Sequence, residues 1–404
     1  MHIILGITGS IAAYKSCTLL RLLVKAGHEV QVVMTPSAKE FITPLTLATL
    51  SRKPVVSDFF DRRDGSWHSH VDMSQWADML IVAPASASTI AKMTHGIADN
   101  ILVTTYLAQR PDTPVIVCPA MDLDMYSHEA TQANLQKLHA RSHHYVVEPA
   151  EGELASLLVG KGRMQEPEVI ADFVGRYFAE QQRSSQPLYG KRVLITAGPT
   201  HEPIDPVRFI GNASSGRMGF ALAEAFAVMG AEVELVAGPV ACTTHQPHIT
   251  RHDVMTAEQM HSACLALFPQ CDGAVLCAAV ADFTYPHAHA SKLKREGSGG
   301  LNLSLVPTQD IAAALGQMKR EDQRLVGFAL ESDDGEANAK EKMQRKHFDF
   351  IALNSMQHSN PIGSDSNDIV LLFADGRREA SGRSSKAVWA QRIAAHFAAL
   401  FTMS

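Results

Sequence analysis

The chain contains the same short pattern twice: an apolar strand, a glycine turn, a helix and a second strand. Residues 3–34 show the pattern first, and residues 192–237 repeat it more loosely. In each copy a glycine, Gly27 or Gly230, stands where a residue in the left-handed conformation would end the helix. A strand–helix–strand unit joins parallel strands through a right-handed crossover. The repeat therefore predicts parallel sheets.

Further apolar segments extend each copy into a larger domain. We predict an α/β fold with two doubly wound domains, flavodoxin-like and Rossmann-like, over residues 1–180 and 191–404. The polar segment 181–190 is the expected linker. A hairpin is expected after the last strand, at an Asp-Gly turn, and a helix over 384–401. The remaining strands are expected at residues 79–84, 113–119, 145–149, 273–279, 301–306, 324–330, 348–353 and 368–376.

Composition restricts the partners and the compartment. The 404 residues carry a net charge of -6 and no dense Lys/Arg run, which argues against nucleic acid as a partner. No apolar stretch is long enough to cross a bilayer and the start lacks signal-peptide features, so we expect no membrane partner and a cytoplasmic protein. The six cysteines form no CxxC pair and fit free thiols in a reducing compartment. The nineteen histidines show no zinc-site spacing, which favours surface positions.

Small and hydroxyl-bearing residues follow the first three strands of the first half. Gly9 and Ser10 lie at a strand end and helix start, where free N–H groups favour a phosphate, although a tight turn without a ligand fits the same pattern. Ligands of open α/β sheets bind beyond the carboxyl ends of the strands. We therefore predict a mononucleotide site there. The other loop residues expected in it are Ser37, Ala85, Ser86 and Ser88.

A long excursion interrupts the second copy. The strand ends before Gly198, but a good helical pattern begins only near Ser215. The segment between them carries Asn212 and an "SSG" turn. Loops of this length inside a compact domain are usually functional, although a surface insertion rich in Pro and Asp is the alternative.

Several motifs resemble one bacterial family. "GITGSIAAYK", "APASAST" and "CPAMDLDMY" resemble the flavin-dependent cysteine decarboxylases. "ITAGPTHEPIDPVRFIGNASSGRMG" and "AAVADF" resemble phosphopantothenate–cysteine ligases. Nearly the whole chain thus resembles the bifunctional coenzyme A biosynthesis proteins of bacteria.

For the first domain, the resemblance implies FMN and decarboxylation of 4′-phosphopantothenoylcysteine to 4′-phosphopantetheine. The flavin would oxidise the thiol to a thioaldehyde, which accepts the electrons released as CO2 departs. The family's catalytic histidine matches His70, with His68 expected on the same strand face. Asp122 replaces an Asn that engages the substrate carboxylate, and an ionised Asp would repel that group unless it is protonated or turned toward a different partner. Ser156 replaces a proton-donating Cys and is a much weaker acid, so three outcomes stay open: release of an unreduced enethiol, protonation by another acid, or an impaired last step.

For the second domain, the resemblance implies that CTP converts 4′-phosphopantothenate into an acyl-cytidylate, which cysteine then attacks. The tip of the excursion would present Asn212 to the mixed anhydride, and Lys292 would stabilise developing charge, with Arg295 where a third Lys is usual. Mg2+ would bridge the triphosphate, with Asp282 near the ribose or the metal-bound phosphate. The implied CTP contacts are Leu276, Cys277, Ala278, Asp282, Lys292, Gln309, Asp310, Ile311, Ala312, Phe328, Lys342 and Lys346.

The resemblance also implies a homo-oligomer of trimeric decarboxylase units and paired ligase domains. The expected partners are otherwise small molecules: CTP, 4′-phosphopantothenate and cysteine. Two other functions remain open at this point. One is a regulatory, non-catalytic flavoprotein in the first domain. The other is a dinucleotide-dependent dehydrogenase, which is disfavoured because no Gly-x-Gly-x-x-Gly follows either strand.

Overall fold

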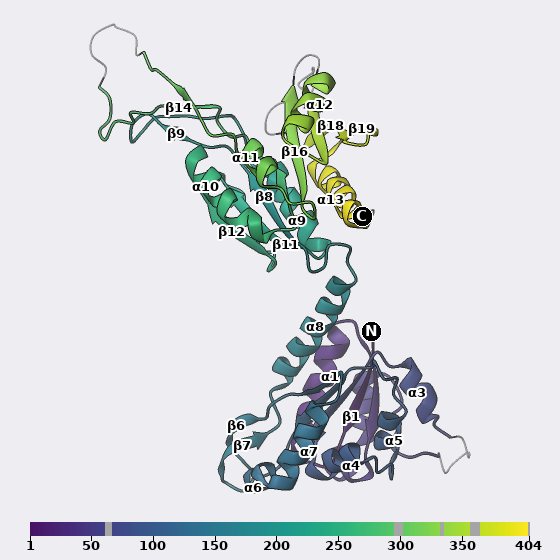
Figure 1. Cartoon of the computed structure of the whole chain (residues 1–404). Helices are drawn as coiled ribbons and strands as arrows, with labels where there is room; N and C mark the ends of the chain where they lie inside the picture. Colours follow the sequence, from purple (N-terminus) through teal and green to yellow (C-terminus); the bar gives the residue numbers. More distant parts are fainter. Residues whose placement is uncertain (61–66, 295–301, 332–334, 356–363, 403–404) are drawn as a thin grey trace. The chain divides into compact units, whose positions relative to one another are not determined.

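A computed structural model of the chain shows two compact units, Met1–Ala179 and Glu180–Ser404 (Figure 1). The division falls inside helix α8 (Pro167–Ser184). Residues 181–184 of the expected linker therefore continue this helix, and the rest of the linker lies beyond its end. Each unit is an α/β fold built on its own sheet, as predicted. The structure describes residues 1–60, 67–294, 302–331, 335–355 and 364–402.

The first unit contains a five-stranded sheet in the order β2-β1-β3-β4-β5, and all of its neighbouring strands are parallel. This is the flavodoxin-like order, in which the chain reverses its direction of winding between β1 and β3. Gly27 has φ +84°, which confirms the left-handed end of the helix before β2. The strands are β1 (His2–Ile7), β2 (Glu29–Met34), β3 (Met79–Ala85), β4 (Val115–Pro119) and β5 (His144–Val146).

Helices cover both faces of this sheet because alternate strand residues point to opposite sides. Ile3 and Leu5 pack with α1 (Lys15–Lys25) and α8, whereas Ile4 and Leu80 pack with helices on the other face. The remaining elements are η1 (Ile11–Tyr14), η2 (Pro36–Glu40), α2 (Pro44–Ser51), α3 (His70–Trp76), α4 (Ala87–His95), α5 (Ile101–Leu107), α6 (Leu123–Ser127), α7 (Glu129–His139) and the hairpin of β6 (Ala150–Glu153) and β7 (Val159–Arg163).

The second unit contains an eight-stranded sheet in the order β12-β11-β8-β13-β16-β17-β18-β19. The strands from β12 to β17 are parallel, and β18 and β19 form the expected antiparallel hairpin. Gly230 has φ +96°, in agreement with its predicted role. The strands are β8 (Arg192–Ala197), β11 (Glu232–Ala237), β12 (Ile249–Asp253), β13 (Gly273–Leu276), β16 (Arg324–Glu331), β17 (Phe350–Ser355), β18 (Ser366–Phe373) and β19 (Arg378–Ser385).

Two hydrophobic layers cover this sheet. One contains α9 (Arg217–Val228) and α13 (Lys386–Thr402), whose Phe226 and Phe397 rings meet with centroids 5.0 Å apart. The other contains α10 (Ala257–Leu267), α11 (Ile311–Met318) and α12 (Gly335–Arg345), with η3 (Phe268–Gln270) after α10. The helix α13 confirms the expected closing helix.

Two pairs of very short strands project as an arm from the second unit (Figure 1). They are β9 (Glu202–Pro203) with β10 (Phe209–Ile210), and β14 (Phe283–Thr284) with β15 (Val306–Pro307). The expected strand over 301–306 is therefore wrong for residues 302–305, since β15 begins only at Val306.

Candidate functional site

The second unit contains a crevice of about 770 Å³ at the carboxyl ends of its central strands. Strand β8 pairs with β11 on one side and β13 on the other, so the direction of winding reverses between β8 and β13. Such a switch point is where open α/β sheets bind ligands, because the loops after the two strands diverge. Thr196 at the end of β8 and Leu276 at the end of β13 both line this crevice.

The crevice wall is held together by close backbone contacts. The buried Thr196 hydroxyl accepts hydrogen bonds from the N–H groups of Cys277 and Ala278, both at 3.1 Å. Gly219 of α9 lies so close to β8 that a Cβ there would be 2.5 Å from the Cβ of Ala197. Gly198 has φ +78°, which lets the chain turn away from the sheet at this point. The start of α9 and the end of β8 are therefore in direct contact at the crevice.

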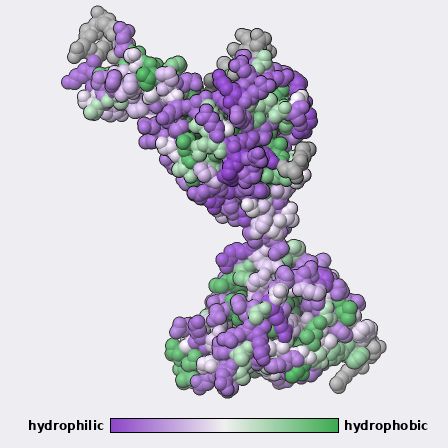
Figure 2. Space-filling view, in the orientation of Figure 1, coloured by the Kyte–Doolittle hydropathy of each residue, from purple (hydrophilic) through white to green (hydrophobic). Residues whose placement is uncertain are grey.

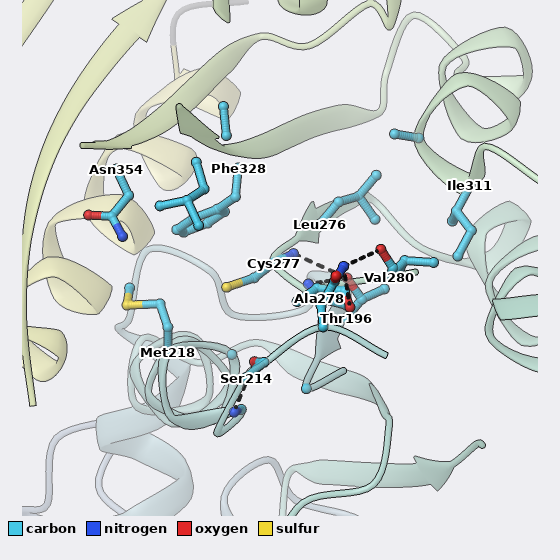
Figure 3. A pocket seen from close by; sticks show the side chains of 18 of the residues that line it. Thr196, Ser214, Met218, Leu276, Cys277, Ala278, Val280, Ile311, Phe328 and Asn354 are labelled. Atoms are coloured by element: carbon cyan, nitrogen blue, oxygen red, sulfur yellow. Dashed lines mark hydrogen bonds between the residues drawn. The ribbon is translucent and has the colours of Figure 1, made fainter. Parts of the chain in front are cut away.

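Most residues expected to contact CTP line this one space. Figure 3 shows Leu276, Cys277, Ala278, Ile311 and Phe328 among them. They come from segments that are far apart in the sequence: the end of β13 and the residues after it, the start of α11 and the residues before it, β16, and α12 with the residue after it. Lys292 is the exception, because it is exposed and lies outside the described crevice lining. The expected residues that line the crevice are Leu276, Cys277, Ala278, Asp282, Gln309, Asp310, Ile311, Ala312, Phe328, Lys342 and Lys346.

Two lysines reach the crevice from α12 and the residue after it. The Lys342 ammonium donates to the carbonyl of Phe328 at 3.1 Å. The mostly buried Lys346 pairs with Asp310 at 2.8 Å, and Asp310 also caps α11 by accepting from the Ala313 N–H at 3.0 Å. Burial opposes ionisation of Asp310, but Lys346 and that N–H outweigh it, so the pKa of this carboxyl is lowered. The pair thus places a fixed cation beside the crevice.

Further polar residues, which were not among the expected site residues, also line the crevice. Lys386, the first residue of α13, is half-buried, and burial lowers the pKa of its ammonium group. Arg217, the first residue of α9, forms an ion pair with Asp365. Asn354 could have been found, because it directly follows the predicted strand 348–353. The cations Lys386 and Arg217 belong to helices of one layer, whereas Lys342 belongs to the other.

The excursion after Gly198 is a hairpin arm and not a structureless loop. Its turn is held by Asp205, whose side chain accepts from the Val207 and Arg208 N–H groups, both at 2.8 Å. Asn212 was expected at the tip of the excursion. It does not lie there, because the chain has returned to the sheet before it reaches this residue. Its amide donates to the Val280 carbonyl at 2.9 Å and lines the crevice. The expected position Arg295 lies outside the described residues.

The three loops expected to bind a mononucleotide in the first unit do meet. A Cβ on Gly9 would lie 2.6 Å from the Ser37 hydroxyl, so the ends of β1 and β2 touch. The Ser86 N–H donates to the Thr8 hydroxyl at 2.9 Å, which joins the ends of β1 and β3. Ser10 caps η1. Ala85 directly precedes Ser86, and Ser88 lies two residues after it. This cradle of small residues, hydroxyls and helix starts fits a phosphate-bearing cofactor such as FMN.

His70 and His68 were expected to share one face of a strand. This expectation is wrong, because His70 is the first residue of the helix α3. Its ring meets the edges of Phe59 and Trp67, with centroids 6.5 and 6.4 Å away. Its Nδ1 is buried and has no hydrogen-bond partner. A buried polar atom without a partner is costly, and a catalytic role is one of the explanations for keeping it.

A cavity of about 520 Å³ in the first unit contains Asp122, together with Ser10 and Arg163. Asp122 precedes α6, but its carboxylate does not cap that helix. Ser156 is exposed in the turn between β6 and β7, and it is not part of the described lining of this cavity. The two substituted positions of the family pattern therefore lie in different surroundings.

The described part of the chain contains no group of three His, Cys, Asp or Glu side chains arranged to hold a metal ion. All six cysteines are free thiols, and burial raises the pKa of Cys277 in the crevice to about 12. None of the described helices is both long and apolar enough to cross a bilayer.

Comparison with known proteins assigns both units. Residues 1–178 match the family described as "Flavoprotein", and residues 188–400 match "DNA/pantothenate metabolism flavoprotein C-terminal domain". A "Coenzyme A biosynthesis bifunctional protein CoaBC" of Bacillus subtilis is 43% identical over 93% of this chain and 91% of its own length. That of Haemophilus influenzae is 41% identical over 95% of this chain and 94% of its own. A "Cysteine/Cysteine sulfinic acid decarboxylase" of an unknown prokaryotic organism is 53% identical over 82% of this chain and 91% of its own.

The two folds and their matches define a flavoprotein of pantothenate metabolism with a second α/β domain. The chain belongs to the family of bifunctional coenzyme A biosynthesis proteins. It is accordingly an enzyme, with a decarboxylase-type flavoprotein domain and a ligase domain in one chain. This assignment decides against the dinucleotide-dependent dehydrogenase.

Proposed function

We propose that the second unit joins 4′-phosphopantothenate to cysteine with CTP, and that the first unit decarboxylates the product with FMN to give 4′-phosphopantetheine. The observation that carries the ligase part is the crevice at the switch point. It is lined by Asn212 and by all the CTP contacts implied by the resemblance except Lys292. The corresponding domains are residues 1–180 and 191–404.

The charges of the crevice suit a reaction with two phosphate-bearing substrates. Lys342 and Lys346 approach from one layer of helices, and Arg217 and Lys386 from the other. One pair of cations can hold the triphosphate of CTP while the other holds the phosphate of phosphopantothenate. Mg2+ would bridge the triphosphate near Asp282, since it prefers phosphate and carboxylate oxygens.

Ligation then takes two balanced steps. The substrate carboxylate attacks the α-phosphorus of CTP, and pyrophosphate leaves. The cysteine amine attacks the resulting acyl-cytidylate, the acyl–oxygen bond breaks, and CMP and a proton depart. Asn212 is held beside the crevice by its hydrogen bond to Val280 and would orient the mixed anhydride. We propose that Lys292 reaches the mixed anhydride when the arm moves inward.

For decarboxylation, FMN would supply the two-electron acceptor that makes loss of CO2 possible. Gly9, Ser10, Ser37, Ala85, Ser86 and Ser88 would hold it at the ends of β1 to β3. The unpartnered Nδ1 of His70 would position or accept the proton of the substrate thiol. Asp122 would contact the substrate, and the exposed hairpin carrying Ser156 would cover it.

We further propose the homo-oligomer described above, trimeric in the decarboxylase units and paired in the ligase units. Apolar surface interrupts the hydrophilic surface of both units (Figure 2). Ile11 and Tyr14 beside the flavin loops and Trp67 beside His70 are each more than half exposed. An interface would remove these side chains from water.

The test supplies the purified, flavin-loaded enzyme with CTP, 4′-phosphopantothenate and cysteine. Pyrophosphate release should require all three, and mass analysis should show 4′-phosphopantetheine or its enethiol. Since one relative is named for free cysteine, CO2 release is measured with both free and acylated cysteine. Pyrophosphate release without any CO2 would leave a ligase joined to a regulatory flavoprotein. Absence of pyrophosphate would refute the ligase.

A further inference from the structure

The loop after β13 forms one wall of the crevice in the second unit. Residues 277–282 connect the end of β13 to the start of β14, and all six line the crevice. Buried backbone groups need hydrogen-bond partners, and outside a helix or a sheet these partners are side chains, turns or water. The partners of this loop therefore decide the shape of the surface that it offers to a ligand.

Two threonine hydroxyls, at the end of β8 and just beyond it, hold three N–H groups of the loop. Thr196, the last residue but one of β8, accepts from Cys277 and Ala278, both at 3.1 Å. Thr200 accepts from the Ala281 N–H at 3.0 Å. Both threonines are buried, with exposed fractions of 2% and 0%, so bulk water does not compete for these hydrogen bonds. The hydroxyls thus join the segment of β8 to the loop across the switch point of the sheet.

Other contacts hold the same loop, but they are of a different kind. The Ala279 N–H donates to the Gly198 carbonyl at 2.8 Å, and a change of side chain does not remove such a backbone bond. The Thr308 hydroxyl donates to the Ala281 carbonyl at 2.7 Å, so it binds a carbonyl and not an N–H group. The role of the three N–H bonds can therefore be tested at Thr196 and Thr200.

The oxygen of the Thr196 hydroxyl accepts as many hydrogen bonds as it has lone pairs, which is two. Valine has nearly the same shape but no oxygen, so Thr196→Val leaves both N–H groups without this partner. An unpaired buried N–H is costly, and the loop can lower this cost by moving toward another acceptor. Because Cys277 and Ala278 line the crevice, such a movement changes the binding surface itself.

We propose that Thr196 and Thr200 are positioning residues of the second unit, which hold residues 277–282 in the shape that binds the nucleotide. The identity of this nucleotide, CTP, rests on the proposed function. Each threonine acts through N–H groups of the loop and has no need to touch the ligand. A displaced loop binds the ground state and the transition state less tightly by a similar factor. Loss of either hydroxyl should therefore raise KM for CTP and leave kcat nearly unchanged.

The experiment compares removal of a hydroxyl at the crevice with removal of a hydroxyl elsewhere in the same unit. The test variants are Thr196→Val and Thr200→Val, and Thr196→Ser keeps the hydroxyl. The matched control is Thr256→Val. The Thr256 hydroxyl also accepts from a backbone N–H, that of Gln259 at 3.2 Å, but it caps α10 outside the described lining of the crevice. The full-length, flavin-loaded enzyme is assayed for pyrophosphate release against CTP, for CTP binding by titration calorimetry, and for thermal unfolding.

We expect Thr196→Val and Thr200→Val each to raise KM for CTP and to weaken calorimetric binding of CTP by about tenfold or more. Their kcat should stay within about threefold of the wild-type value. Thr196→Ser should stay within about threefold of the wild type in KM, kcat and CTP binding, because its hydroxyl can accept the same N–H groups. Thr256→Val should lower the melting temperature without a change in CTP binding, because it removes only a helix cap.

A lower melting temperature combined with an unchanged KM for CTP, in either Thr196→Val or Thr200→Val, would make that hydroxyl purely structural and would overturn the proposal. If Thr196→Val does not fold, Thr200→Val decides by the same criterion. A wild-type enzyme that binds CTP but releases no pyrophosphate would refute the ligase function instead. In that case the calorimetric binding of CTP still decides whether the threonines position the loop.

Discussion

Replacement of Lys342 by Met tests whether the crevice holds the triphosphate. The Lys342 ammonium lines the crevice and donates to the Phe328 carbonyl at 3.1 Å. Met keeps the apolar stem and removes only the charge. A hydrogen bond to a charged group contributes about 1.5–3 kcal/mol. Because 1.4 kcal/mol corresponds to a factor of ten, the expected rise in KM for CTP is about 10- to 100-fold.

The same helix provides the control. Lys340→Met removes an equal charge from α12 at an exposed position outside the described crevice lining. Initial rates of pyrophosphate release are recorded against CTP at saturating phosphopantothenate and cysteine. A loss of uniform binding raises KM and leaves kcat nearly unchanged. If both variants stay within twofold of the wild type, the triphosphate does not contact Lys342 and the proposed site is wrong.

Three further predictions concern the second unit, and one of them takes its comparison, Gly175, from the first unit. Lys386→Met should raise KM for 4′-phosphopantothenate or CTP about tenfold, since it removes a crevice cation from the opposite layer of helices; unchanged constants for both would exclude its role. Gly219→Ala should lower stability by about 1–3 kcal/mol in denaturant unfolding because of the 2.5 Å contact with β8, whereas Gly175→Ala, with no atom within 4 Å, should raise it by about 0.5–1 kcal/mol. Asp310 has a lowered pKa, so its pairing with Lys346 stabilises the fold above the unfolded pKa of about 3.9 and is lost as pH falls through the folded value. Asp310→Asn should therefore lose less stability than the wild type below pH ~4, as measured by urea unfolding; parallel curves would contradict this.

Local patterns in the sequence predicted the elements well. Gly27 and Gly230 ended helices as expected, since a left-handed residue is a purely local requirement. Residues 145–149 gave only a three-residue strand, and 302–305 gave none, because short apolar runs carry little information on whether a neighbouring strand exists to pair with them. His70 started a helix instead of a strand, and the Ser69 side chain caps it.

By itself the sequence determined which loops at strand ends carry glycines, hydroxyls and lysines, because these residues are visible without knowledge of the fold. Only the tertiary structure decided which of them meet. Strand order brought Lys342 and Lys386 to one crevice, and it left Lys292 on the arm. It also placed Asp122 beside Arg163 through a contact between backbone segments. Pairing between distant segments depends on packing of the whole sheet, and no local pattern encodes it.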